Sequence, residues 1–190
     1  MTPVRLVLAA LITLAVVACG SSPPTRYYRL DATAVRSPAV DAIGHGVVRI
    51  EAVAIPPELN RLEIVTRSGP NRVLVSGADR WAAPLDVQIR RVLSQDLSRR
   101  LPPNSVADPD EPAGGTPRRQ LWVGVVEYVA DARCAITLRA NWTLREADDT
   151  GRRGSEDLNL SAQPVCQPAA AMSEALGLLA DRLAAEIVQP

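Results

Sequence analysis

The sequence predicts an α+β fold in which two amphipathic helices pack on one face of an antiparallel or mixed sheet of about six or seven strands. Several segments alternate apolar and polar residues with a period of two, the pattern of half-buried strands. Two longer segments carry a single apolar stripe at helical spacing, so each helix has one face to bury. The chain has 190 residues, 47% of them apolar, which suits one domain with its own core.

The first half of the predicted sheet consists of short strands. Residues 27–30 form the first, and residues 47–54 form the second, which ends at Pro56-Pro57. The alternation of the second strand predicts that one face carries Val48, Ile50, Ala52 and Ala54. Residues 62–67 and 72–75 flank Ser68-Gly69-Pro70-Asn71, a turn sequence, and so predict a hairpin.

The first helix is predicted to begin near Pro84 and to stop at Pro102-Pro103. Its apolar stripe consists of Leu85, Ile89, Val92, Leu93, Leu97 and Leu101. The residues expected off this stripe are Arg90, Arg91, Asp96, Arg99 and Arg100. A polar surface loop rich in Pro and Gly is expected over residues 104–117.

The second half predicts the centre of the sheet and the second helix. Residues 120–129 are apolar on both faces, as in a central strand, and residues 134–145 alternate almost without exception. A turn at 148–151 leads to a returning strand at 156–162. The stripe of the C-terminal helix consists of Met172, Leu176, Leu179, Leu183 and Ile187.

The N-terminus has the three parts of a signal peptide. Arg5 provides a positive start, residues 7–17 are apolar except for Thr13, and Val16-Val17-Ala18-Cys19 follows. The apolar run is too short for a membrane span of about 20 residues. The last four residues resemble the lipobox of bacterial lipoproteins. That resemblance implies cleavage after Ala18.

Lipidation is expected at Cys19, which would carry a thioether diacylglycerol and an N-acyl group as its only prosthetic chemistry. Two or three acyl chains hold a protein stably on a membrane. Residues 19–26 then form a Ser/Pro tether to a single periplasmic domain at 27–190. Gly20, rather than Asp, follows the cysteine, and by resemblance to lipoproteins of diderm bacteria this favours the periplasmic face of the outer membrane. An ordinary signal peptide with an incidental cysteine is the alternative.

Composition excludes several classes of function. Net charge is +0, which argues against nucleic acid as a partner. The chain contains no Lys, so it has no Walker A loop and no Schiff-base lysine. One histidine, His45, and no Cys/His ligand spacing argue against a metal site, and no G-x-S-x-G elbow is present. No catalytic residue, metal or further cofactor is therefore expected, and a secreted hydrolase is disfavoured.

Cys134 and Cys166 remain once Cys19 is acylated. An even number of cysteines in an oxidising compartment predicts a disulfide between them. Cys134 begins a strand and Cys166 precedes the last helix, so both could meet at one end of the sheet. Two buried thiols are the alternative.

Three segments in order resemble the ABC-type transport auxiliary lipoproteins, the paraquat-inducible protein C family. They are Tyr27-Tyr28-Arg29-Leu30, residues 55–67 (IPPELNRLEIVTR) and Asp79-Arg80-Trp81-Ala82-Ala83-Pro84-Leu85. The resemblance covers nearly all of the mature chain. One departure is Asn60, where the family usually has Asp, so an ion pair at that position would become a hydrogen bond.

The resemblance implies an accessory protein without enzymatic activity. Family members accompany an ABC permease and ATPase and a protein with MCE (mammalian cell entry) domains, in systems that move lipids or other hydrophobic molecules and support envelope integrity. The implied partners are the MCE protein, through it the ABC proteins, and outer-membrane lipid, with homo-oligomerisation into a ring left open. The rival hypotheses are a structural or assembly lipoprotein without an ABC partner and a carrier with an apolar pocket.

Arg61, Arg67 and Trp81 are the candidate partner-binding residues because the family motifs are densest around them. An Arg side chain binds a carboxylate through two parallel hydrogen bonds, so both arginines could meet a partner's carboxylates. An internal salt bridge to Glu58, Glu63 or Asp79 is the structural alternative. For Trp81 the alternative is a packing residue that fixes the start of the helix.

Overall fold

The computed structural model describes residues 23–33, 46–110, 119–148 and 150–189. The predicted signal peptide, Cys19 and His45 lie outside the described residues. In chain order the elements are β1 (Arg26–Tyr28), β2 (Val48–Ala54), the 3₁₀ turn η1 (Pro57–Leu59), β3 (Glu63–Gly69), β4 (Arg72–Trp81), α2 (Leu85–Arg100), β5 (Arg119–Asp131), β6 (Ile136–Glu146), β7 (Gly151–Leu160) and α3 (Pro168–Ile187).

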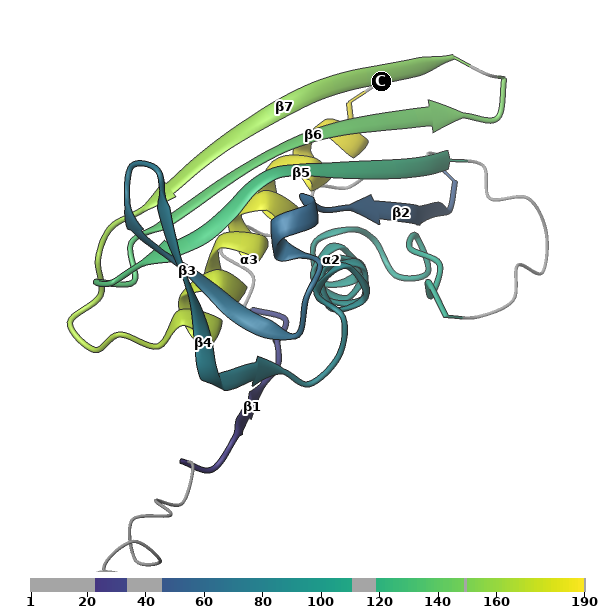
Figure 1. The fold of residues 1–190 in the computed structure, drawn as a ribbon. Coiled ribbons are helices and arrows are strands. Elements are labelled where there is room, and N and C mark those ends of the chain that lie inside the picture. The colour runs from purple at the N-terminus through teal and green to yellow at the C-terminus, as the bar shows by residue number, and fades with distance from the viewer. Residues whose placement is uncertain (1–22, 34–45, 111–118, 149, 190) are drawn as a thin grey trace, which may run out of the picture.

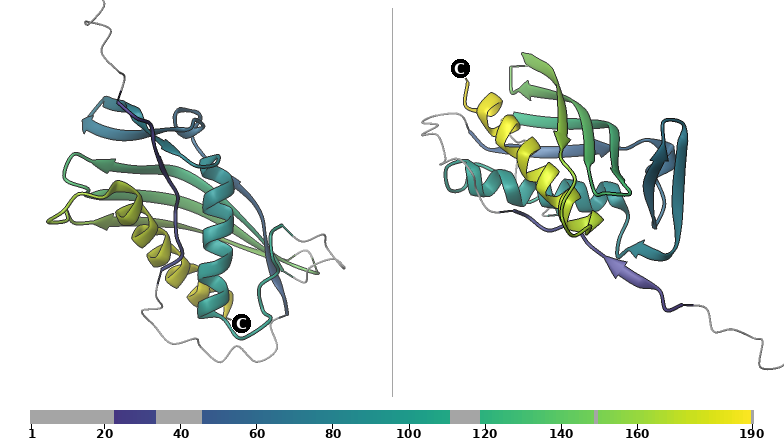
Figure 2. Two further views of the ribbon diagram at one scale, coloured as in Figure 1. Left: turned by 90° about the horizontal axis from the view of Figure 1, so that it is seen from below. Right: turned by 90° about the vertical axis from the view of Figure 1, so that its left-hand side faces the viewer.

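One mixed, seven-stranded sheet contains all of these strands, in the order β1-β4-β3-β5-β6-β7 with β2 also paired to β5. Strands β2 and β3 follow each other along the same edge of β5, both parallel to it. β2 covers the first half of β5, and β3 touches only its end at Ala130 and Asp131. Both helices lie on one face of the sheet (Figures 1 and 2), which confirms the predicted α+β fold.

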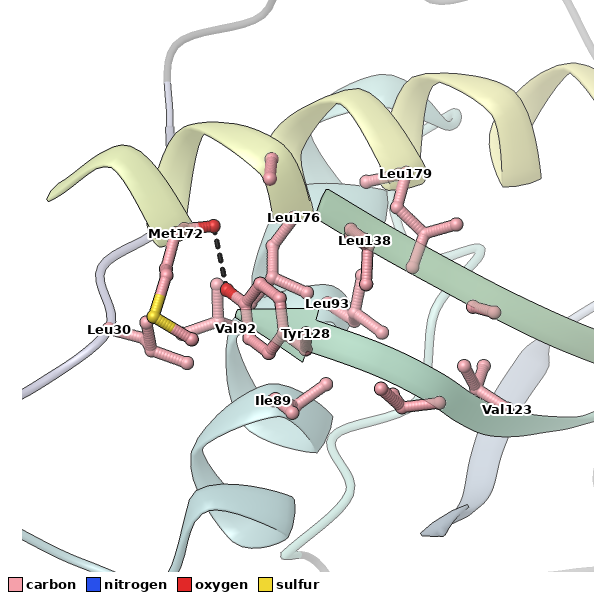
Figure 3. Close-up of a cluster of buried hydrophobic side chains, with 14 of the residues drawn as sticks. Leu30, Ile89, Val92, Leu93, Val123, Tyr128, Leu138, Met172, Leu176 and Leu179 are labelled. Atoms are coloured by element: carbon pink, nitrogen blue, oxygen red, sulfur yellow. Dashed lines mark hydrogen bonds between the residues drawn. The ribbon is translucent and has the colours of Figure 1, made fainter. Parts of the chain in front are cut away.

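The core lies between the helices and β5 and β6 (Figure 3). Every residue of the two predicted helical stripes is buried, as are the inward residues of β6. Tyr128 of β5 is fully buried, and its hydroxyl donates a hydrogen bond of 2.7 Å to the carbonyl of Met172 in α3. Burial raises the pKa of this phenol well above its ordinary value of 10.0, so it stays neutral and acts as a donor.

Three strands differ most from the expectation. β4 continues to Trp81, whereas the predicted strand ends at residue 75. The pairing of β2 with β5 shifts between Ile50 and Ala52, and this bulge reverses the faces of the residues that follow. Ala52 and Ala54 are therefore exposed, whereas Val53 packs against the core. β7 begins at Gly151 and not at residue 156, because its polar first half pairs with β6 throughout.

The close fit of β7 to β6 depends on Gly154. A Cβ there would lie 2.4 Å from the Trp142 ring of β6, so the strand lies directly against that indole. The sequence has no alternation at residues 151–156, because this half of the strand contributes no apolar side chains of its own.

Asp96 and Arg100 of α2 are buried, with relative exposures of 0% and 3%, although the helical stripe placed them off the apolar face. The Arg100 guanidinium donates to Asp96 Oδ1 at 3.0 Å, to Asp181 Oδ1 of α3 at 2.6 Å and to the Gly177 carbonyl at 3.0 Å. These contacts join the two helices. The helix therefore buries a polar face as well as an apolar one.

Residues 28–33, here called the N-terminal strap, run between α2 and α3 (Figure 2, left). The backbone N–H of Leu30 donates to Gln88 Oε1 at 2.9 Å, that of Asp31 to Ser173 Oγ at 3.1 Å and that of Thr33 to Asp96 Oδ1 at 2.9 Å. Burial raises the pKa of the Asp96 carboxyl, against the opposing effects of the Thr33 hydrogen bond and of Arg100. The polar helix residues thus fix the segment that leads from the N-terminus.

Within the part of the chain that the structure describes, neither helix has the length and apolar character required to cross a bilayer.

Candidate functional site

The β3–β4 hairpin stands at one side of the sheet and turns at Pro70-Asn71 (Figure 1). Its two strands pair in regular register from Val65 with Val75 to Arg67 with Val73, and the register shifts by one residue next to the turn, where Gly69 pairs with Arg72. Beyond Val65, away from the turn, the next pair is Glu63 with Arg80, so residues 76–79 bulge out of the ladder. Ser76 Oγ stabilises this bend by accepting the N–H of Asp79 at 2.8 Å and donating to its carboxylate at 3.1 Å. β4 therefore has two halves that run in different directions.

A groove with a volume of about 310 Å³ lies between this hairpin, the 3₁₀ turn η1 and the far end of β5. The family-like segment supplies Pro56, Glu58, Leu59, Val65 and Arg67 to its lining. The hairpin turn and β4 add residues 69–73, β5 adds residues 126–129 and β6 adds Arg139. We call this surface the motif groove, because the motif, the hairpin turn and β5 build most of it.

Three of the five charged residues that line the motif groove form one ion-pair cluster, and the other two are Glu58 and Arg72. Glu127 is bonded to Arg67 through one carboxylate oxygen and to Arg139 through the other, with Arg139 Nη2 at 2.6 Å and Nε at 3.0 Å. The side chains are 35% exposed for Arg67, 51% for Arg139 and 16% for Glu127. Because one carboxylate neutralises one of two guanidinium groups, the cluster keeps one positive charge, and exposed donors remain for a further anion.

The structure separates the three predicted partner-binding residues. Only Arg67 lies in the motif groove. Arg61 points to Glu63, one of the acidic residues considered for an internal pair, at 3.8 Å and with 45% of its side chain exposed.

Trp81 is 2% exposed and belongs to the core, so it is a packing residue and offers no surface to a partner. The backbone N–H of Trp81 donates to the Leu62 carbonyl at 2.6 Å, and the residue pairs with Tyr28 of β1 shortly before α2 begins.

Asp79 lies near the end of β4 that is remote from the hairpin turn. It binds the β1 residue Arg26 through two hydrogen bonds of 2.6 and 3.0 Å. The Arg26 hydrogen bond holds the pKa of the Asp79 carboxyl below its ordinary value of 3.8. This pair attaches the start of the described chain to the end of β4 opposite the hairpin turn.

Cys134 and Cys166 form the disulfide that the cysteine count predicts, with their Cα atoms 5.2 Å apart. Cys134 is fully buried in the turn between β5 and β6, whereas Cys166 is exposed just before α3. The bond therefore joins the end of the two central strands to the start of the second helix.

Glu127, Arg139 and Val126 are among the groove residues that the sequence patterns did not indicate. Glu127 is the one acidic residue in the apolar run 120–129, which marks it as unusual for a central strand. A bulge between Val125 and Glu127 turns it toward the groove and leaves Val126 49% exposed. Arg139 belongs to the ordinary polar face of β6 and carried no distinguishing pattern.

The chain is similar to proteins of known name. The Intermembrane transport lipoprotein PqiC of Escherichia coli (strain K12) is 26% identical over 118 residues, which cover 62% of this chain and 62% of that protein. PqiC of Shigella flexneri matches with the same values. The match thus spans less than two thirds of the relatives' length.

Two solved structures have the same fold. A crystal structure of an uncharacterized protein has a TM-score of 0.68 and 23% identity, covering 87% of this chain and 97% of that one. A crystal structure of a protein from Xanthomonas campestris has a TM-score of 0.64 and 17% identity, covering 84% and 93%. The family model described as "ABC-type transport auxiliary lipoprotein component" matches residues 28–188 of the sequence. This range includes β7, both helices and the motif groove. The chain therefore belongs to the ABC-type transport auxiliary lipoprotein family.

Proposed function

We propose that this protein is a non-enzymatic docking subunit of an ABC/MCE-type transport system for lipids or other hydrophobic molecules. Its acylated Cys19 holds it on the periplasmic face of the outer membrane. An MCE-domain protein, which links it to the ABC permease and ATPase, binds at the motif groove. The family supports the auxiliary role, and the groove supports the docking role.

The observation that carries the proposal is the shared carboxylate of Glu127. Arg67 and Arg139 both bind it and are partly exposed, so this cluster in the groove lining keeps one net positive charge. Val126 and Val73, exposed by 49% and 51%, form an apolar rim beside these charges. A partner's Asp, Glu or C-terminal carboxylate flanked by apolar residues has the matching chemistry.

The tether supports docking rather than bridging. Eight residue steps from Cys19 to Tyr27 reach at most about 29 Å at full extension. A domain of this size has a radius of gyration of about 15 Å. β1 pairs only with residues 79–81 of β4, and the N-terminal strap fixes the chain beyond it. The domain therefore remains beside its membrane, and a partner has to reach it.

Removing the groove arginines tests the docking surface. Arg67→Gln with Arg139→Gln should lower co-purification of the MCE protein from gently solubilised membranes by about tenfold or more, since each charge-assisted hydrogen bond contributes about 1.5–3 kcal/mol. Arg61→Gln is the matched control, because Arg61 lies in the same motif, is similarly exposed and lies outside the groove. The control should retain the partner.

Two results would contradict this assignment. Equal co-purification of the double variant and wild type would remove the groove from the interface. Recovery of wild type with outer-membrane assembly proteins and without any MCE or ABC protein would favour the structural or assembly lipoprotein.

The anchor has its own test. Cys19→Ala should block lipidation and release the protein from the outer-membrane fraction, as precursor or as soluble material. Fractionation and intact mass measure both effects, and a mature wild-type mass without acyl chains would disprove the lipoprotein anchor.

A further inference from the structure

The half of β4 next to the hairpin turn is an open sheet edge. Residues 72–75 pair with β3 on one side, and within the described part of the chain no strand pairs with their other side. β1 pairs with β4 only from Asp79 to Trp81. An unpaired edge presents a row of backbone N–H and C=O groups that can accept another strand.

This edge is apolar on both of its faces. Val73, Leu74 and Val75 are consecutive and are 51%, 49% and 44% exposed. Val73 lines the motif groove, and Leu74 points to the opposite face, since successive side chains of a strand alternate. A single partner side chain in the groove would leave Leu74 in water, whereas an added strand would cover both faces.

The opposite edge of the sheet is built differently. β7 pairs only with β6, and its edge carries Arg152, Arg153, Glu156 and Asp157. Charged residues on an edge strand oppose unwanted pairing. β4 has no such protection between its turn and its bend, where Arg72 is the single charged residue.

The protein's own N-terminal segment is poorly suited to this edge. The bend at residues 76–79 turns the β1-paired half of β4 away from the open half. Pro23 and Pro24, just before β1, have no N–H to donate to a ladder. Among the described residues no segment pairs with this edge, so it is open to another chain.

We infer that residues 72–75 bind an extended segment of the transport partner by strand addition, with the segment continuing into the motif groove. This inference rests on the proposed docking function. The segment has apolar side chains on both faces and carries an acidic group, which complements Arg72 at the edge and Arg67 in the groove. Backbone hydrogen bonds supply the binding, and side chains select the segment.

Backbone hydrogen exchange tests strand addition directly. The full lipidated chain is compared alone and in the co-purified complex with the MCE protein. Amides in residues 73–75 that face the open edge should exchange at least about tenfold more slowly in the complex, because a new ladder bond must break first. Unchanged exchange at these amides in an intact complex would overturn the inference while leaving the docking function in place.

Proline variants separate backbone pairing from side-chain contact. Neighbouring amides in a strand point to opposite sides, so only one of Val73→Pro and Leu74→Pro removes an edge donor. That variant should lower the amount of co-purified MCE protein at least tenfold, with little change in melting temperature. The other should mainly lower the melting temperature, because it breaks the ladder with β3.

Leu74→Lys adds a charge to the edge and should also weaken the complex at least tenfold. Val47→Lys is its control: Val47 is 38% exposed and bonds to Arg119, at the end of β5 opposite the hairpin. Equal retention of the partner by both lysine variants would overturn strand addition. Failure of wild type itself to retain the MCE protein would overturn the docking function and this inference together.

Discussion

The helix-covered side and the hairpin side of the molecule each have a cluster of three charged residues, but the numbers of arginines and carboxylates in the two clusters are reversed. On the covered side one arginine, Arg100, is shared by two carboxylates, Asp96 and Asp181, and is 3% exposed. On the hairpin side one carboxylate, Glu127, is shared by two arginines that are 35% and 51% exposed. The first cluster is sealed between two helices, whereas the second is open to solvent.

The difference separates residues that hold the fold from residues that are free to bind. The donors of Arg100 go to Asp96, Asp181 and the Gly177 carbonyl, and burial of this guanidinium keeps an outside group from reaching it. The motif groove keeps an excess positive charge beside exposed apolar residues. We therefore expect substitutions on the covered side to change stability strongly, and those on the hairpin side to change it little.

Arg100→Met should have the largest effect. It leaves Asp96 buried without its cation, and breaking a buried pair in this way costs about 3–5 kcal/mol. Urea unfolding of the purified domain measures the loss. Arg91→Met, at an exposed position of the same helix, is the control and should change stability by less than about 0.5 kcal/mol. Equal stability of the two variants would show that the buried cluster does not hold the helices together.

Reduction of the Cys134–Cys166 disulfide should have the second-largest effect on the free energy of unfolding. A bond between residues separated by 32 positions stabilises by roughly 3–4 kcal/mol in the chain-entropy account. Urea unfolding of the oxidised and the reduced protein measures this difference in stability. Thiol labelling of the denatured, unreduced lipoprotein should find neither Cys134 nor Cys166, and two labelled thiols would refute the bond.

Gly177→Ala should have an intermediate effect. A Cβ at this position of α3 would lie 2.0 Å from Thr33 Oγ1, so the N-terminal strap would have to shift. Overpacking of this kind costs about 1–3 kcal/mol. Gly77→Ala is the matched control, since a Cβ there meets no atom within 4 Å. A similar thermal stability for both variants would mean that the strap is loosely held.

The Arg26–Asp79 pair on the hairpin side should give the smallest effect and a defined pH dependence. The folded-state pKa of Asp79 is lowered by its hydrogen bond from Arg26, so its contribution to stability is present above about pH 4. That contribution is lost as the pH falls through the lowered pKa. The stability difference between wild type and Asp79→Asn should therefore shrink toward zero in acid, and a difference that grows in acid would contradict the assignment.

Local patterns in the sequence by themselves determined much of this fold. The helical stripes and the alternation of β6 describe burial along one segment, and the turn at 68–71 follows from its residue types. Each leads to the observed element. The family motif also led to Arg67. The even cysteine count led to the Cys134–Cys166 pair, since compartment and number are properties of the sequence.

Only the tertiary structure decided the polar and irregular parts. Asp96 and Arg100 are buried because the strap and Asp181, remote in sequence, supply their partners. The bulge in β2 reverses its later faces, and the partners of Arg67 come from β5 and β6 rather than from its own motif. A period in the sequence reports which face of a segment is apolar. It carries no information on which distant segment will satisfy a polar group, and that pairing determines both the sealed cluster and the open one.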